Sequence, residues 1–512
     1  MNDRQPEHKD RRPGDRGPKT FRDNRGASRP ASGRPGGKPG FAGQRRPGPG
    51  ASGRPGGKRP EDRQAQNPSP ARAAALEALR DVLDRGAYVS EAVDRQLSKS
   101  TFPQVERRFC TALVYGTLEN LTAIDHILDA YIEEPEKLDQ TARHILRLSV
   151  CQKAFMDKVP DNAIADEAVK LTRASGLEYL TGLVNGVLRS YMREPEKVVW
   201  PDEQEEPARF LSLRWSYPEW VAERLIAYYG LDTAEKVLKS RPLRHDMTLR
   251  PNLTRLSDEQ FEQMLSRKVW QAEKGRVPHS WHVSGVMQVA RDSDYLSGAF
   301  SIQGEASMLC ALLTGARPGM TVLDACAAPG GKTALMAEMM QGAGRVHAWD
   351  VHEHRVALLN AMKKRLQLDN IRTAAHDARL PKEDFYQRMD VVLTDAPCSG
   401  LGVVNDKPDI RYGVTQESVQ AMNETQRDIL NACAEYVKKG GRLIYSTCSI
   451  LPEENEEMCR WFLTGHPEFS LEEVPDWVRE LYPQARTQTG LQLLQGVDGD
   501  EGFYIACMKR NG

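Results

Sequence analysis

The sequence predicts a multidomain protein that ends in an α/β domain built on a Rossmann-like, doubly wound parallel sheet. From about residue 299 onward, short apolar strand patterns alternate with helical periodicity, which is typical of a parallel sheet covered on both faces. A loop of small residues follows the first of these strands, and polar residues follow the others. Strands are expected near 321–324, 345–350, 371–376, 390–395 and 441–446, helices near 333–340, 353–368 and 416–438, and a closing antiparallel pair at 491–495 and 502–509.

The first 70 residues have a different composition from the rest. They contain 13 Gly and 12 Pro, with 17 Lys and Arg against 7 Asp and Glu, and one octapeptide occurs at both 31–38 and 51–58. Such a segment buries too little apolar area to offset its conformational entropy, so residues 1–70 are expected to be a disordered, basic Arg/Gly/Pro-rich tail. Its composition fits binding to nucleic acid phosphates and a solubilising role about equally well.

Two regions lie between this tail and the α/β domain at 299–512. Residues 71–200 show helical periodicity with few Pro or Gly, which predicts an all-α domain. After an acidic linker, residues 209–298 mix short helices with strand patterns such as 247–252, which predicts a small α/β module.

Composition also limits the setting in which the protein works. The chain has 512 residues, enough for about three domains, and no run approaches the ~18 apolar residues of a membrane span. Its nine cysteines include no CxxC pair, so neither a zinc site nor a disulfide framework is expected. We therefore expect a soluble, cytoplasmic protein with free thiols, without a metal and without membrane contact.

The loop after the first strand, at 325–333, has the features of a cofactor-binding loop. It reads Ala-Cys-Ala-Ala-Pro-Gly-Gly-Lys-Thr and is expected to open a helix, and its small residues let backbone amides approach a ligand at little steric cost. The ending Gly331-Lys332-Thr333 suggests the phosphate loop of an ATPase. However, that motif requires Gly where Cys326 stands, so NTP hydrolysis is a weak alternative, and the dinucleotide pattern GxGxxG is absent.

Acidic residues follow the next strands. Asp350 ends the second strand, where an acid commonly accepts hydrogen bonds from ribose hydroxyls, and Asp377 follows the third. A single acid at a strand end is usually a solvated turn residue. Acids at successive strand ends beside a glycine loop instead indicate a nucleoside-binding edge.

Two cysteines stand where later strands give way to loops, Cys398 in Asp-Ala-Pro-Cys-Ser-Gly and Cys448 in Tyr-Ser-Thr-Cys-Ser. If the strands ending at Asp395 and Ser446 are neighbours, both thiols lie over one pocket beside the loop. Most cysteines are buried core residues, and the other seven are assigned that role. Spacing alone does not decide which of the two thiols is the nucleophile.

Together these segments resemble the Sun-type RNA cytosine-5 methyltransferases, over about residues 71–510. Further matching segments are Gln303-Gly304-Glu305-Ala306-Ser307, Asp409-Ile410-Arg411-Tyr412 and Glu454-Asn455-Glu456. The helical segments 109–116 and 183–189 resemble the NusB-type RNA-binding domain, which narrows the resemblance to the bacterial small-subunit ribosomal RNA cytosine-5 methyltransferase B type. One departure is Asn405-Asp406, where relatives often carry basic residues, which puts phosphate contact there in doubt.

The resemblance implies an enzyme that transfers a methyl group from S-adenosylmethionine (SAM) to cytosine C5 through a covalent cysteine adduct at C6. It assigns attack to Cys448, release of the product to Cys398, and contact with the pyrimidine to Asp395. The residues it implies at the cofactor are Cys326, Ala327, Ala328, Pro329, Gly330, Gly331, Lys332, Asp350, Asp377 and Asp395.

The expected partner is RNA, with ribosomal RNA favoured and the target cytosine single-stranded or flipped out of a duplex. Transfer RNA is the alternative substrate, and a non-catalytic ribosome-assembly factor is the alternative class of protein. Intact Cys398 and Cys448 argue against the second alternative. A monomer is expected.

Overall fold

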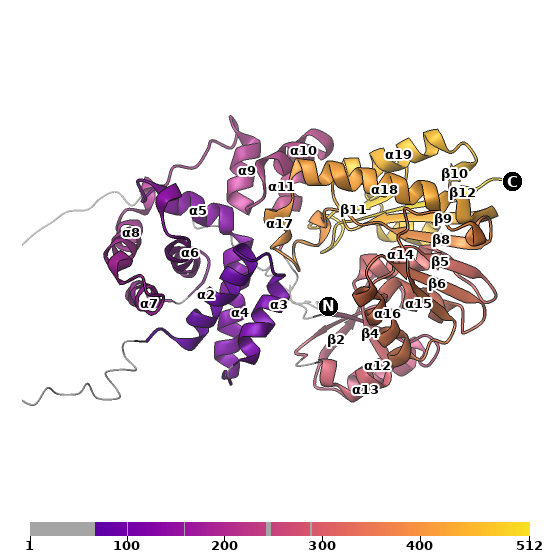
Figure 1. Ribbon diagram of the computed structural model, residues 1–512, viewed down its shortest axis with the longest axis horizontal. Helices are drawn as coiled ribbons and strands as arrows, with labels where there is room; N and C mark the ends of the chain where they lie inside the picture. The colour runs from indigo at the N-terminus through magenta and orange to yellow at the C-terminus, as the bar shows by residue number, and fades with distance from the viewer. Residues whose placement is uncertain (1–66, 100, 158, 242–246, 287–288) are drawn as a thin grey trace, which may run out of the picture. The chain divides into compact units, whose positions relative to one another are not determined.

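The computed structural model describes residues 67–99, 101–157, 159–241, 247–286 and 289–512 (Figure 1). The chain divides into two compact units, with the boundary between Val199 and Trp200. The tail expected at 1–70 lies, up to residue 66, outside the described residues. Within the described ranges, no helix is long and apolar enough to cross a membrane.

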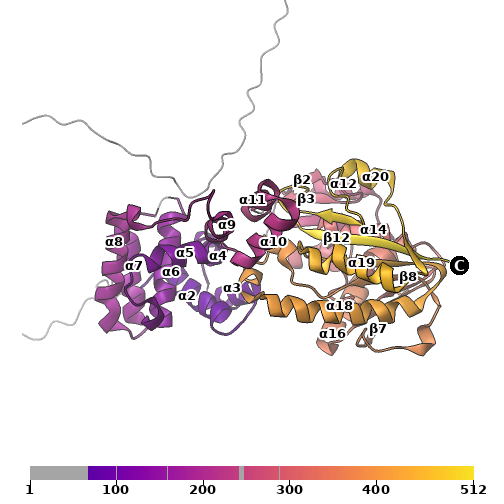
Figure 2. The same ribbon diagram turned by 90° about the horizontal axis from the view of Figure 1, so that it is seen from above.

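The first unit is entirely helical where it is described, which confirms the all-α prediction (Figures 1 and 2, indigo to purple). Helix α6 packs against α2, α4, α5, α7 and α8, and its residues Ile145, Leu146, Leu148 and Val150 are all buried. A helix that is apolar on most of its surface belongs at the centre of a bundle. The helices are α2 (Pro70–Leu83), α3 (Val89–Ser98), α4 (Gln104–Glu119), α5 (Leu121–Asp129), α6 (Gln140–Ala154), α7 (Asp161–Ala174) and α8 (Thr181–Arg193), with short turns η1 (Pro135–Lys137), η2 (Glu178–Leu180) and η3 (Pro195–Lys197).

The second unit contains the predicted parallel sheet. Its strands follow the order β10-β12-β9-β8-β5-β6-β7, with β11 paired to β12. Strands β7, β6, β5, β8 and β9 are parallel, whereas β12 runs antiparallel to β9, β10 and β11. The strands are β5 (Thr321–Asp324), β6 (Arg345–Asp350), β7 (Ile371–Ala375), β8 (Met389–Asp395), β9 (Val437–Thr447), β10 (Phe469–Leu471), β11 (Leu491–Leu493) and β12 (Phe503–Arg510). Both the doubly wound sheet and its antiparallel closure are therefore confirmed.

The two faces of this sheet are buried under different helices. Val322 and Val391 belong to the core with α14, α15 and α16, whereas their neighbours Leu323 and Val392 belong to the core with α18 and α19 (Figure 1). Successive strand residues point to opposite faces, so a run that is apolar at every position indicates a sheet buried on both sides. The helices are α14 (Glu305–Leu313), α15 (Gly331–Met339), α16 (Glu353–Leu366), α17 (Ile410–Gly413), α18 (Gln416–Tyr436), α19 (Glu456–Gly465) and α20 (Asp476–Leu481), with turns η5 (Glu383–Phe385), η6 (Leu401–Val403) and η7 (Pro452–Glu454).

The region 209–298 forms two separate parts of the second unit. Helices α9 (Pro207–Trp215), α10 (Glu219–Tyr229) and α11 (Leu231–Lys239) share a core with Leu401, Val404 and Ile450 of the large α/β domain. The second part is a small antiparallel sheet in the order β2-β3-β1-β4, packed against α12. Its elements are β1 (Met247–Pro251), α12 (Asp258–Ser266), β2 (Gln271–Lys274), β3 (Trp281–Ser284), η4 (Val289–Arg291), α13 (Ser293–Ser297) and β4 (Phe300–Ile302).

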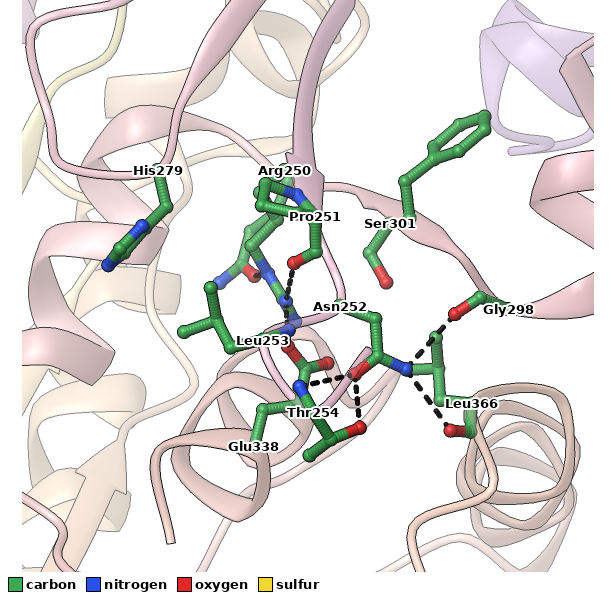
Figure 3. Close-up of polar contacts among 12 residues, drawn as sticks. Arg250, Pro251, Asn252, Leu253, Thr254, His279, Gly298, Ser301, Glu338 and Leu366 are labelled. Carbon is green, nitrogen blue, oxygen red and sulfur yellow. Dashed lines mark hydrogen bonds and ion pairs between the residues drawn. The ribbon is translucent and has the colours of Figure 1, made fainter. Parts of the chain in front are cut away.

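A buried polar junction connects the small sheet to the large domain (Figure 3). Arg250 of β1 donates to Glu338 of α15 at 2.6 Å, and both side chains are fully buried. The amide of Asn252 donates to the backbone oxygens of Gly298 and Leu366, at the end of α16. The small sheet is therefore held against the two helices that follow the cofactor loop and strand β6.

Candidate active site

The loop between β5 and α15 is fixed to the edge of the sheet by its backbone. The peptide N–H of Ala327 donates to the carbonyl of Trp349 in β6 at 2.7 Å. Gly330 has φ +110°, and a Cβ there would lie 2.5 Å from the side chain of Met362. Gly331 starts α15, whose first peptide N–H groups have no partner within the helix. Cys326, Ala328 and Pro329 complete the loop, which lies at the carboxyl ends of β5 and β6.

Asp324, at the end of β5, is a site residue that the sequence analysis did not single out. Its side chain is buried, and burial raises its pKa to about 7. Oδ2 accepts a hydrogen bond from the hydroxyl of Thr333 at 2.6 Å. Oδ1 is buried without a donor of its own among the described residues. The backbone of Cys326 also contributes a hydrogen bond that lowers the pKa of this carboxyl, so Asp324 fixes the start of the loop.

The two expected nucleoside-binding acids already have partners. Asp350 is buried, accepts from the backbone N–H of His352 at 3.1 Å and lies 3.2 Å from a guanidinium nitrogen of Arg355. Asp377 pairs with Arg379 through two of its oxygens, and the hydrogen bonds from Arg379 lower the pKa of this carboxyl. Both acids lie at the strand ends where the sequence places them. A ribose that reaches Asp350 must displace or share Arg355.

Lys332 and Asp395 form an ion pair beside the loop. Their Nζ and Oδ2 atoms are 2.7 Å apart, and the hydroxyl of Ser446 donates to the other carboxylate oxygen at 2.8 Å. Burial works to lower the pKa of Lys332, but the adjacent charge of Asp395 outweighs it and the pKa is raised. The ammonium also lies 5.0 Å from the centre of the Phe503 ring. The ion pair places both a donor and an acceptor beside the loop.

The two strand-end cysteines are in contact. Asp395 of β8 and Ser446 of β9 are partners in the parallel ladder, and the chain beyond them brings Cys398 Sγ within 3.3 Å of Cys448 Sγ. A hydrogen bond from the Cys398 thiol lowers the pKa of Cys448 against the opposing effect of burial. The same bond, with burial, raises the pKa of Cys398. Of the two thiols, Cys448 is therefore the one that loses its proton more readily.

The other seven cysteines have a different environment. Six of them are buried: Cys110, Cys151, Cys310, Cys433, Cys459 and Cys507. Burial raises the pKa of each of these, and also that of Cys326, so their thiolate forms are disfavoured. Among the described residues, no cluster of His, Cys, Asp or Glu has the arrangement of a metal site.

Backbone hydrogen bonds connect Cys448 to Gly402 and Gly402 to Gly502, the residue directly before β12. The carbonyl of Cys448 accepts from the peptide N–H of Gly402 at 2.9 Å, and the carbonyl of Gly402 accepts from Gly502 at 2.6 Å. A Cβ on Gly402 would lie 1.9 Å from the oxygen of Gly502, so only glycine fits there. Three segments far apart in the sequence meet at this point.

A cavity of about 310 Å³ lies next to these segments. Gly304, Glu305, Asn405, Asp406 and Glu501 are among its lining residues. Asn405, where relatives often carry a basic residue, donates to the hydroxyl of Ser240 and to the carbonyl of Asp500. The side chain of Asn405 therefore connects the segments that carry Ser240 and Asp500. The lining of the cavity is acidic here, because Glu305, Asp406 and Glu501 belong to it.

A doubly wound sheet with an antiparallel closing strand, a small-residue loop after its first strand and acids at the next strand ends defines the methyltransferase class. Comparison with known proteins agrees with this assignment. Residues 311–509 match the family model of the 16S rRNA methyltransferase RsmB/F, and residues 69–193 match that of the NusB family.

Similar proteins extend over most of the chain. A probable ribosomal RNA small subunit methyltransferase B of Bacillus subtilis is 36% identical over 447 residues, which cover 86% of this chain and 99% of the relative. The corresponding protein of Synechocystis is 31% identical over 448 residues, with the same coverage. This chain belongs to the RsmB/F family of 16S rRNA methyltransferases, with a NusB-family domain before the catalytic part.

Solved structures agree on the fold. The crystal structure of PH0851 aligns with a TM-score of 0.72 at 26% identity, covering 86% of this chain and 99% of that one. NSun6 from Pyrococcus horikoshii, crystallised with SFG, aligns with a TM-score of 0.50 at 19% identity, over 58% of this chain and 99% of that one.

Proposed function

We propose that the protein methylates C5 of a cytosine in small-subunit ribosomal RNA, with SAM as methyl donor and Cys448 as covalent catalyst. The observation that carries the proposal is the 3.3 Å contact between Cys398 and Cys448 beside the Lys332–Asp395 pair. C5 of cytosine is a poor nucleophile, and addition of a thiolate at C6 makes it enamine-like. A low-pKa thiolate next to a second, protonated thiol suits this reaction.

The residues present fit SAM at the edge formed by β5, β6 and β7. The small-residue loop 326–332 would lie along the ligand, and Asp350 would accept from its ribose hydroxyls. Asp377 would lie at the base. When bound, SAM supplies an electrophilic methyl group. The NSun6 neighbour was crystallised with SFG, which supports SAM as the cofactor.

The chain's own groups would move the protons and the electron pair. The sulfur of Cys448 forms a bond to C6 while a donor in the site protonates N3, for which the Asp395–Lys332 pair would orient the pyrimidine edge. After methylation, C5 loses its proton, the S–C6 bond breaks, and the electron pair returns to the sulfur of Cys448. While Cys448 is attached to the base, Cys398 is released from its hydrogen bond. It would assist this elimination either as a thiolate, after giving up its own proton, that takes the proton from C5, or by ordering another base that does so. N3 gives up the proton it received when the product forms.

The substrate proposal rests on the family and on the relatives named for the small ribosomal subunit. A duplex hides C5 and C6, so the cytosine must be single-stranded or flipped into the pocket. The NusB-family unit would add RNA contact. The same chemistry on transfer RNA is the second candidate, and a non-catalytic assembly factor is the third.

Methyl transfer from labelled SAM to purified 16S ribosomal RNA, transfer RNA and assembling small subunits tests these possibilities together. We expect label in small-subunit RNA, mapped to 5-methylcytosine. Label in transfer RNA alone would replace the proposed substrate, label at another atom would refute the C5 chemistry, and absence of transfer to any RNA would favour the assembly factor.

A further inference from the structure

Glu454, the last residue of η7, lies between the two cysteine-bearing loops. Its side chain is fully buried although it carries a carboxyl group. The sequence analysis noted the residue only as part of a motif. Nothing in the reaction proposed above uses it, so its buried carboxyl group requires another explanation.

The carboxylate receives four hydrogen bonds, and three of them come from the residues that directly follow the two cysteines. Oε1 accepts from the peptide N–H of Ser399 at 2.8 Å and from the amide of Gln426 at 3.2 Å. Oε2 accepts from the hydroxyl of Ser399 and from the hydroxyl of Ser449, each at 2.5 Å. Ser399 follows Cys398 and Ser449 follows Cys448, so this one side chain connects both loops.

The other flank of each cysteine is held from the same side. Gln426, which donates to Glu454, also donates to the carbonyl of Pro397 at 2.9 Å, just before Cys398. Asn455, next to Glu454, accepts from the hydroxyl of Thr447 at 2.5 Å and donates to the carbonyl of Ser449 at 2.9 Å, on the two sides of Cys448. Both thiols therefore stand on backbone segments fixed at each side.

We propose that Glu454 is a positioning residue that holds the Cys398 and Cys448 loops in register, so that the two thiols are in contact at the start of each catalytic cycle. The role of this contact in methyl transfer rests on the function proposed above. The proposal that Glu454 holds the two thiols in contact does not rest on that function, because it concerns only the positions of the thiols.

An ionised carboxylate suits this position because all four neighbours donate and a carboxylate only accepts. Burial raises the pKa of Glu454, and the hydrogen bonds from Ser399 and Ser449 oppose that effect. A glutamine side chain at this position would replace one acceptor oxygen by an NH₂ group. That group would either face the N–H donors of Ser399 and Gln426, or require the hydroxyls of Ser399 and Ser449 to rotate and accept. The negative charge also adds to the causes that raise the pKa of Cys398, after its bond to Cys448 and burial. It thereby favours Cys398 as the protonated partner.

The test compares Glu454→Ala and Glu454→Gln with Glu457→Gln as the matched control. Glu457 lies in the first turn of α19, is exposed and loses the same charge. In the full-length protein without RNA, diamide takes two electrons and two protons from the thiol pair and leaves a disulfide, which peptide mass spectrometry detects. We expect Glu454→Ala to slow formation of the Cys398–Cys448 disulfide by about 10-fold or more, since misplaced reacting atoms lose effective concentration steeply.

Methyl transfer and SAM affinity are measured on the same variants. We expect kcat to fall about 10–100-fold for Glu454→Ala and less for Glu454→Gln, while the SAM Kd stays within about twofold of wild type. Glu457→Gln should match wild type in every measurement. If Glu454→Ala does not fold, Ser399→Ala and Ser449→Ala each remove one donor and should each slow disulfide formation.

Equal disulfide rates in wild type and in every folded variant at these positions would overturn the proposal. A wild-type protein that methylates no RNA cytosine, yet forms the disulfide quickly and loses that ability in Glu454→Ala, would overturn only the proposed reaction. Unchanged disulfide rates in an active enzyme would overturn only the positioning role.

Discussion

The contact between the two cysteines lowers the pKa of Cys448 and raises the pKa of Cys398. Replacing one cysteine should therefore give a different result from replacing the other. Cys448→Ala should abolish methyl transfer and leave no covalent RNA adduct, because no sulfur remains to add at C6. Cys398→Ala should let the adduct form and then accumulate, because elimination loses its assistance. A denaturing gel after incubation with RNA and SAM should show a slow band for Cys398→Ala alone. The reverse pattern would make Cys398 the nucleophile.

The same pair predicts a pH dependence that needs no RNA. Because the hydrogen bond with Cys398 lowers the pKa of Cys448, alkylation of Cys448 should reach half its maximal rate at a lower pH than alkylation of an ordinary cysteine. In Cys398→Ala the donor is gone while burial remains, so the midpoint should move to higher pH. Iodoacetamide labelling from pH 5 to 10, read on the Cys448 peptide, measures both values. Coincident profiles would contradict the assignment of Cys448 as the thiolate.

At the scale of single elements, the proposed ribose contact lies in the turn from β6 into α16. Asp350→Ala should weaken SAM binding by ~1–3 kcal/mol, because charge-assisted hydrogen bonds to the ribose are lost. Arg355→Ala is the matched control, since it removes the present partner of Asp350 and leaves the carboxylate. Titration calorimetry should show a smaller loss for Arg355→Ala than for Asp350→Ala. Equal affinities for wild type and Asp350→Ala would place the ribose elsewhere.

The strands and their connecting helices could be predicted because their patterns are local. Two-sided burial makes β5 and β8 continuously apolar, and the strand ends that carry Asp350, Asp395 and Cys448 follow from that pattern. The pairing of Asp324 with Thr333 and of Asp350 with Arg355 could not be predicted, because it depends on side-chain directions within the folded loops. The role of Glu454 could not be predicted either, because its partners lie far apart in the sequence. It depends on four donors from three segments, which no sequence spacing encodes.

For the molecule as a whole, the buried junction of Arg250 and Glu338 should matter for stability. Removing one partner of a fully buried ion pair leaves an uncompensated charge, which typically costs ~3–5 kcal/mol. Glu338→Ala should therefore lower the thermal unfolding temperature of the second unit clearly, by differential scanning calorimetry. Glu457→Gln, which changes an exposed residue, should leave the unfolding temperature unchanged within experimental error. A similar unfolding temperature for both variants would show that the guanidinium finds other partners.

The replacement of both partners by apolar residues provides a second comparison. Arg250→Met with Glu338→Leu should recover much of the loss, because neither charge then remains buried.

The hydrogen bonds from Gly502 to Gly402 and from Gly402 to Cys448 have a consequence for the order of folding. Strand β12 pairs with β9, the strand that leads to Cys448, and Gly502 directly precedes β12. Until β12 has paired, β9 has an unpaired edge and the carbonyl of Gly402 lacks its donor. The backbone around Cys448 is therefore completed by a segment that lies far from this cysteine in the sequence.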